Sequence, residues 1–186
     1  MIKSHRLSQY QTKEWFDTSK IICSIRNPCD AIASSLQRRS NNQAPSSASV
    51  KRQLEEFERF GIFDVVALHS NPNAMVLRYE DFYDNWDYLF SRIESFLQIS
   101  ISLGVRKRCM DELAIEVVEA KSRRLGGFSN YDKTDHIHGQ HISQYRGQVG
   151  YGVDFLGREF SQQVYTRFQV VFEEFHYPTP FMATDA

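Results

Sequence analysis

Apolar and polar positions follow one another along this chain in blocks whose spacing predicts short strands between helices. The first block, residues 20–25, is an apolar run rich in β-branched isoleucine, typical of a strand, and it stops before Pro28, which cannot continue strand pairing. A segment over about 29–39 follows, in which Ile32 and Leu36 have helical spacing. Strand, polar turn and helix in this order predict half of a β-α-β unit, in which the turn at the carboxyl end of the strand binds ligands.

The remainder of the chain repeats the alternation of helical and extended patterns. Apolar spacing predicts one short buried strand over 75–77. It also predicts further helices over about 51–68, 86–97, 104–124 and 157–175. Two polar segments predict loops, of which 40–49 is expected to be a mobile surface loop or lid and 128–156 a long functional or disordered loop. Strands that alternate with helices indicate an α/β layer fold with a parallel sheet, and 186 residues predict a single domain over 1–186.

Composition and charge narrow the classes of function. The chain has 22 Lys or Arg against 23 Asp or Glu, so it has no overall field that would attract nucleic acid or an acidic membrane. It contains neither the long apolar run of a membrane span nor the profile of a signal peptide. Its three cysteines have no C-x-x-C spacing, which favours a reducing compartment. We expect a cytoplasmic protein without a nucleic-acid partner, and a homo-oligomer is left open.

Arg26 stands at the turn between the first strand and the following helix. The amino end of that helix directs unpaired N–H groups at the turn and favours an anion, and the guanidinium beside it is a permanent, forked donor. Ser34 lies about one and a half turns into the helix from Cys29, near enough for its hydroxyl to share a phosphate with Arg26. The same residues also suit a helix-entry turn with a solvated arginine and a small residue on a packed helix face.

Four separated motifs together resemble the sulfotransferases that use 3′-phosphoadenosine 5′-phosphosulfate. In chain order they are Lys3-Ser4-His5, then Arg26 to Asp30 with Ser34, then Tyr79-Glu80-Asp81-Phe82 with Phe96-Leu97, and finally Arg146-Gly147 with Gly150. The resemblance implies a P-loop-NTPase-like, three-layer α/β/α fold with a parallel sheet. It also implies transfer of a sulfuryl group from this nucleotide to a hydroxyl or amine of a small-molecule or carbohydrate acceptor, without a metal.

The resemblance gives catalytic roles to two residues near the amino end. His5 is implied to be the general base, and an imidazole with an ordinary pKa of about 6.5 can accept a hydroxyl proton near neutral pH. Lys3 is implied to stabilise the transferring sulfuryl group. Residues i and i+2 of a strand share a face, so both side chains can address one substrate. A histidine this close to the chain terminus also suits a merely exposed position.

The resemblance also implies a nucleotide site. Arg26 and Ser34 are implied to hold the 3′-phosphate, and Tyr79 to lie near the adenine. Arg146 and the N–H groups around Gly147 can close over the same phosphate, because glycine lets the backbone approach an anion closely. Tyr79 alternatively packs on the core at a strand end, and the Arg146 segment is alternatively an ordinary polar turn.

One family feature has no counterpart in the sequence. The family holds the 5′-phosphosulfate in a loop rich in glycine and serine that carries a lysine, and no segment here matches it. We therefore expect a chain truncated at its amino end, or a protein that has lost half of the donor site. The alternative function is a catalytically inactive or fragmentary nucleotide-binding module that retains only the 3′-phosphate half-site. A P-loop kinase is disfavoured because G-x-x-x-x-G-K-[ST] does not occur.

Three histidines in the long loop, His136, His138 and His141, were the remaining candidates for chemistry. Acidic residues lie close to them, but no cysteine does, and their spacing matches no zinc pattern. A polar loop is the preferred interpretation, and we predict no metal site.

Overall fold

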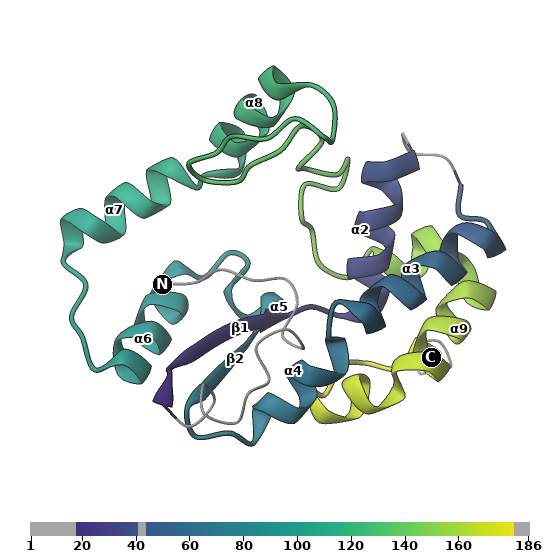
Figure 1. Ribbon diagram of the computed structural model, residues 1–186, viewed down its shortest axis with the longest axis horizontal. Helices are drawn as coiled ribbons and strands as arrows, with labels where there is room; N and C mark the ends of the chain where they lie inside the picture. The colour runs from purple at the N-terminus through teal and green to yellow at the C-terminus, as the bar shows by residue number, and fades with distance from the viewer. Residues whose placement is uncertain (1–17, 41–43, 181–186) are drawn as a thin grey trace, which may run out of the picture.

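The computed structural model describes residues 18–40 and 44–180, and two parallel strands lie at its centre (Figure 1). Strand β1 (Ile21–Ile25) pairs with β2 (Ala74–Arg78) in a register that sets Ile21 opposite Ala74 and Ile25 opposite Arg78. Both strands end at the same edge, so the residues that follow them become neighbours. The predicted α/β fold with a parallel sheet is confirmed.

Helices from both halves of the chain build the core beside this sheet. Helix α2 (Pro28–Ser40) follows β1 directly, and α9 (Gly152–Glu174) packs along it (Figure 1). α3 (Ser47–Arg59) and α4 (Ile62–His69) then lead to β2. Fully buried members of the core come from α2, α3 and α9; they are Ile32, Ala33, Val50, Val164, Phe168 and Val171. Packing with α9 therefore fixes the position of α2.

The predicted helix over 51–68 is two helices. The backbone turns at Gly61, whose φ of 91° is a left-handed conformation that glycine adopts without steric cost. The first of the two begins earlier than predicted, because Ser46 and Ser49 form a reciprocal capping box at its amino end. The predicted loop over 40–49 is correspondingly shorter, and residues 41–43 lie outside the described part.

The second half of the chain contains shorter and more exposed helices. A single turn, α5 (Tyr79–Phe82), precedes α6 (Trp86–Leu97), which confirms the predicted amphipathic helix. The predicted helix over 104–124 is again two, α7 (Leu103–Glu112) and α8 (Ile115–Leu125), because Leu113 and Ala114 leave the helical conformation. Within α9, Gly157 is not helical, with φ of 74° and ψ of 170°, so the kink there separates a short first segment from the helix predicted to begin near 157.

The long loop after α8 runs back to α2 (Figure 1). This return is what carries residues near 147 to the edge of the sheet. Within the described ranges no helix has the length and apolar character needed to cross a bilayer. The cytoplasmic location stays a prediction.

Candidate functional site

The turn after β1 is held in place from two sides. Pro28 occupies the first position of α2, where its missing N–H is no loss, and the Asn27 side chain accepts a hydrogen bond of 2.9 Å from the Cys29 N–H. The Asn27 N–H itself donates to the Glu80 carboxylate at 2.8 Å, which ties the turn to the residues after β2. Arg26 is therefore fixed at the junction of strand and helix.

The Arg26 guanidinium lies against the far loop. Its Nη2 atom donates to the carbonyls of Gly147 at 3.0 Å and Gln148 at 2.5 Å. The ring of Tyr79 packs 4.5 Å from the guanidinium carbon, and the Tyr79 hydroxyl donates to the same Gly147 carbonyl at 3.1 Å. Arg26 and Tyr79 meet because they follow directly on two strands that end side by side. The structure thus brings together three of the residues predicted for the nucleotide site.

Asp30 joins this loop to α2. Its carboxylate, only 2% exposed, accepts hydrogen bonds of 2.7 Å from the N–H groups of both Gly150 and Gly152. The same carboxylate lies 3.8 Å from the Arg26 guanidinium. The sequence places Asp30 at the end of the Arg26 to Asp30 motif and predicts no contact for it. The signal for this contact was the Gly-x-Gly spacing in the loop, because two closely spaced glycines let two N–H groups converge on one carboxylate.

Two glycines allow the close approach of the loop. A Cβ atom at Gly147, whose φ is 81°, would lie 2.5 Å from the Tyr79 hydroxyl. At Gly152 a Cβ atom would lie 2.4 Å from the Asp30 nitrogen and from the carbonyl carbon of Cys29. Contacts this short are not possible for a side chain, so only glycine permits the observed backbone path.

Ser34 is connected to the Arg26 site by Tyr151, whose phenol lies beside the Ser34 hydroxyl. This tyrosine is buried, and burial raises its pKa, while the Ser34 and Ser143 hydroxyls next to its phenol oppose the rise. Its ring lies 5.8 Å from the Arg26 guanidinium, so Ser34 and Arg26 flank the same aromatic group. Burial also raises the pKa of Tyr79, to about 12. Both phenols therefore stay neutral and act as hydrogen-bonding groups at neutral pH.

The Arg146 side chain points away from Arg26. Its guanidinium lies 2.7 Å from the Glu116 carboxylate and 3.7 Å from that of Glu119, both on α8. Its backbone stays at the site, where the Arg146 carbonyl accepts a hydrogen bond of 3.4 Å from the Tyr83 hydroxyl. The shared phosphate contact expected for Arg146 stays a prediction.

Lys3 and His5 lie outside the described residues, so their catalytic roles also stay predictions. Among the described residues, no cluster of three histidine, cysteine, aspartate or glutamate side chains is arranged to hold a metal. The imidazoles of His138 and His141 instead pack edge to face, with centroids 4.6 Å apart.

The geometry around Arg26 can bind an anion. The Nε atom of Arg26 is buried and has no hydrogen-bond partner, although a buried donor without a partner costs about 1–3 kcal/mol. The guanidinium sits at the amino end of α2, where the helix dipole favours negative charge. An oxyanion placed here would accept a hydrogen bond from this donor and add to the negative charge that Asp30 places 3.8 Å from the guanidinium. A phosphate group has the required charge and acceptor oxygens.

One comparison with known proteins identifies a family. The family model described as "Sulfotransferase domain" matches residues 1–176. A comparison with curated proteins gave no match.

Solved structures resemble the fold at low sequence identity. Retinol dehydratase in complex with androsterone and inactive cofactor PAP has a TM-score of 0.57 at 18% identity, over 94% of this chain and 50% of that one. Its complex with retinol and PAP has a TM-score of 0.57 at 19% identity, over 93% and 50%. Mouse sulfotransferase SULT7A1 complexed with PAP has a TM-score of 0.52 at 19% identity, over 89% and 60%. This chain therefore spans about half the length of retinol dehydratase.

The likeness to these structures shows a shared fold, and the family match extends over nearly all of the sequence. The chain therefore belongs to the sulfotransferase family.

Proposed function

We propose that this chain transfers a sulfuryl group from 3′-phosphoadenosine 5′-phosphosulfate to a hydroxyl or amine of an acceptor. Family membership supports sulfuryl transfer in general. The observation that supports the nucleotide most directly is the buried, unpartnered Nε of Arg26 at the start of α2. The structural neighbours are complexes with PAP, which is consistent with this choice of donor.

In this proposal the nucleotide binds across the carboxyl ends of the two strands. Arg26 and Ser34 hold the 3′-phosphate, Tyr79 lies near the adenine, and the backbone at Gly147 closes over the phosphate. Arg146 contributes less to affinity than Arg26, because its guanidinium has to leave Glu116 before it can join the site.

The proposed reaction is an in-line transfer. The bond between sulfur and the 5′-phosphate oxygen breaks while a bond forms between sulfur and the acceptor oxygen. The acceptor proton passes to His5, and 3′,5′-adenosine bisphosphate leaves with the electron pair of the broken bond. As in phosphoryl transfer, positioning and cations aimed at developing charge supply most of the rate. Lys3 is the proposed cation at the sulfuryl group.

Calorimetric titration with 3′,5′-adenosine bisphosphate tests the nucleotide site. Removing hydrogen bonds to a charged group costs about 1.5–3 kcal/mol, so Arg26→Ala should weaken binding about tenfold or more. Arg26→Lys keeps the charge but loses the forked geometry, and should lie between alanine and wild type. Arg39→Ala is the matched control, because Arg39 pairs with Glu56 away from the site.

The proposal fails if wild type does not bind the nucleotide, or if Arg26→Ala binds it as tightly as wild type does. Circular dichroism of each variant separates a lost contact from a lost fold.

A binding module without catalysis is the second candidate. It needs only the Arg26 side of the site, where the buried Nε without a partner favours an anion. Transfer of radioactive sulfate from the labelled donor to an acceptor panel distinguishes the two. Nucleotide binding without any transfer would support the binding module.

A further inference from the structure

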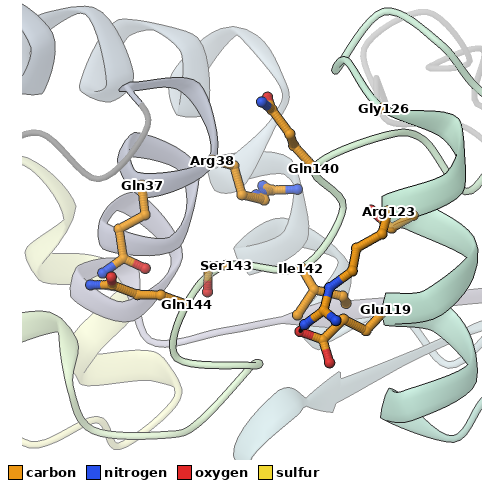
Figure 2. Close-up of a pocket in the computed structure, with 10 residues that line it drawn as sticks. Gln37, Arg38, Glu119, Arg123, Gly126, Gln140, Ile142, Ser143 and Gln144 are labelled. Atoms are coloured by element: carbon orange, nitrogen blue, oxygen red, sulfur yellow. Dashed lines mark hydrogen bonds and ion pairs between the residues drawn. The ribbon is translucent and has the colours of Figure 1, made fainter.

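A cavity of about 360 Å³ separates part of the returning loop from the carboxyl half of α2 (Figure 2). Figure 2 shows Gln37 and Arg38 on the α2 side of this cavity. Ser143, which also lines it, lies beside the Tyr151 phenol, so the cavity adjoins the Arg26 site. The loop is therefore not packed against α2 along its whole length. Contacts from outside the loop matter correspondingly more for holding the turn that carries Arg26.

The Glu80 carboxylate makes such a contact, and it joins three distant segments of the chain. Its Oε1 atom accepts a hydrogen bond of 2.8 Å from the N–H of Asn27, the residue directly after Arg26. Its Oε2 atom accepts a hydrogen bond of 3.0 Å from the Tyr177 hydroxyl, beyond the end of α9. Glu80 itself follows β2 within the single turn α5. The two donors bind different oxygens, so together they fix the orientation of the carboxylate.

Packing determines where the Tyr177 hydroxyl lies. Tyr177 is only 5% exposed, and its ring packs edge to face on that of Phe172, with centroids 6.2 Å apart. Its N–H donates to the Phe172 carbonyl at 2.9 Å. The guanidinium of Arg78, the last residue of β2, lies 5.0 Å from the centroid of the Tyr177 ring. A buried tyrosine hydroxyl usually finds a hydrogen-bond partner, and here that partner is Glu80.

The Tyr177 phenol stays protonated at neutral pH. Burial raises its pKa, and the negative charge of Glu80 raises it further. The positive charge of Arg78 opposes the rise but is a smaller effect. An ionised carboxylate only accepts hydrogen bonds, so the phenol is the donor in this contact.

Without the Tyr177 hydroxyl, the Glu80 carboxylate would lose its second donor. Rotation about the terminal torsion of a glutamate is soft, so the carboxylate would then turn more freely and hold the Asn27 N–H less firmly. Arg26 precedes Asn27, and its forked guanidinium binds an anion through geometry as well as charge. Binding groups have to stay within about 0.5 Å of the productive geometry, so a looser turn at Asn27 weakens the site at Arg26.

We propose that Tyr177 is a positioning residue of the nucleotide site, which acts through Glu80 and Asn27 to hold the Arg26 guanidinium where the 3′-phosphate binds. The inference rests on the proposed function, because that function gives Arg26 its phosphate. Tyr177 itself touches no substrate in this arrangement.

Equilibrium titration of the whole chain with two nucleotides tests this role. 3′,5′-adenosine bisphosphate carries the 3′-phosphate and adenosine 5′-monophosphate lacks it, so the ratio of their affinities measures what the 3′-phosphate contributes. Tyr177→Phe keeps the buried ring and removes only the hydroxyl. It should lower this ratio about two- to tenfold, which is the effect of losing roughly one hydrogen bond. In the Arg26→Ala background, Tyr177→Phe should not lower the ratio further, because the two residues act through one contact.

Tyr165→Phe is the matched control. The Tyr165 ring packs on the same Phe172, with centroids 5.2 Å apart, and the substitution should leave the ratio unchanged. Hydrogen exchange at the Asn27 amide follows the intermediate link, and it should be faster in Tyr177→Phe than in wild type or in Tyr165→Phe.

The positioning role is overturned if Tyr177→Phe has the wild-type ratio, whether both affinities are unchanged or equally reduced. Equal reduction is what a general loss of stability would produce. Unchanged exchange at the Asn27 amide, or a further loss in the Arg26→Ala background, would also overturn it. These outcomes leave the sulfotransferase proposal standing as long as wild type prefers the bisphosphate. If wild type does not bind the bisphosphate, or does not prefer it, the proposed nucleotide site and the role of Tyr177 both fail.

Discussion

The Asp30 carboxylate provides the sharpest test of how the site is assembled. Asp30→Ala removes the acceptor for two buried N–H groups, those of Gly150 and Gly152, each now bonded at 2.7 Å. A buried donor left without a partner costs about 1–3 kcal/mol, so the variant should lose roughly 2–6 kcal/mol of unfolding free energy. Asp30→Asn keeps one acceptor oxygen and should lose about half as much. Domains of this kind are typically stable by about 5–15 kcal/mol, so the change is large.

Urea denaturation followed by circular dichroism measures the loss, and hydrogen exchange at the two glycine amides locates it. Asp87→Asn is the control, because the Asp87 side chain is 98% exposed and the substitution should change stability by less than about 1 kcal/mol. The reasoning is refuted if Asp30→Ala and Asp87→Asn have the same stability, or if exchange at Gly150 and Gly152 is as slow in Asp30→Ala as in wild type.

Gly152 and Tyr79 provide two further tests of the same region. Gly152→Ala should destabilise the fold by several kcal/mol, because its Cβ would overlap the backbone of Asp30. Gly104→Ala is the control: it has open space around it and should stabilise α7 by about 0.5–1 kcal/mol. Thermal melting of the two variants compares their stabilities. Tyr79 has a pKa of about 12 in the folded state against about 10 in the unfolded state. Between these pH values the Tyr79 phenol ionises in the unfolded chain but stays neutral in the folded one. The free energy of unfolding should therefore fall from about pH 10 to about pH 12. Tyr79→Phe should remove that part of the pH dependence, and an identical pH profile would contradict the assignment.

Local sequence patterns predicted the strands and helices whose own residues show a clear apolar run or periodicity. The β-branched run before Pro28 predicted β1, and the periodic apolar stripe from Trp86 to Leu97 predicted α6. The breaks between helices were harder. Gly61 lies at one break, and the conformational freedom of glycine is a sequence signal for it. Leu113 lies at another break, but leucine is an ordinary helix former, so tertiary context ends α7 there.

The candidate site was predictable where neighbouring strands determine it. Arg26 and Tyr79 come together because parallel strands end at one edge, which sequence order alone implies once the sheet is assumed. The position of the Arg146 guanidinium was not predictable, because it depends on where Glu116 and Glu119 of α8 lie. The contact of Asp30 with the loop was missed because a long polar loop has no periodicity that reports its path, and its Gly-x-Gly spacing does not name the carboxylate that it meets.

The Asp30 contact also bears on the order in which the protein is made. The two glycine amides that bind this carboxylate follow it by 120 and 122 residues. At about 5–20 residues per second, a ribosome needs roughly 6–24 s to synthesise that interval. During this time a nascent chain holds α2 without α9 and the returning loop, so the pocket around Arg26 stays incomplete until residues 147–152 have been made.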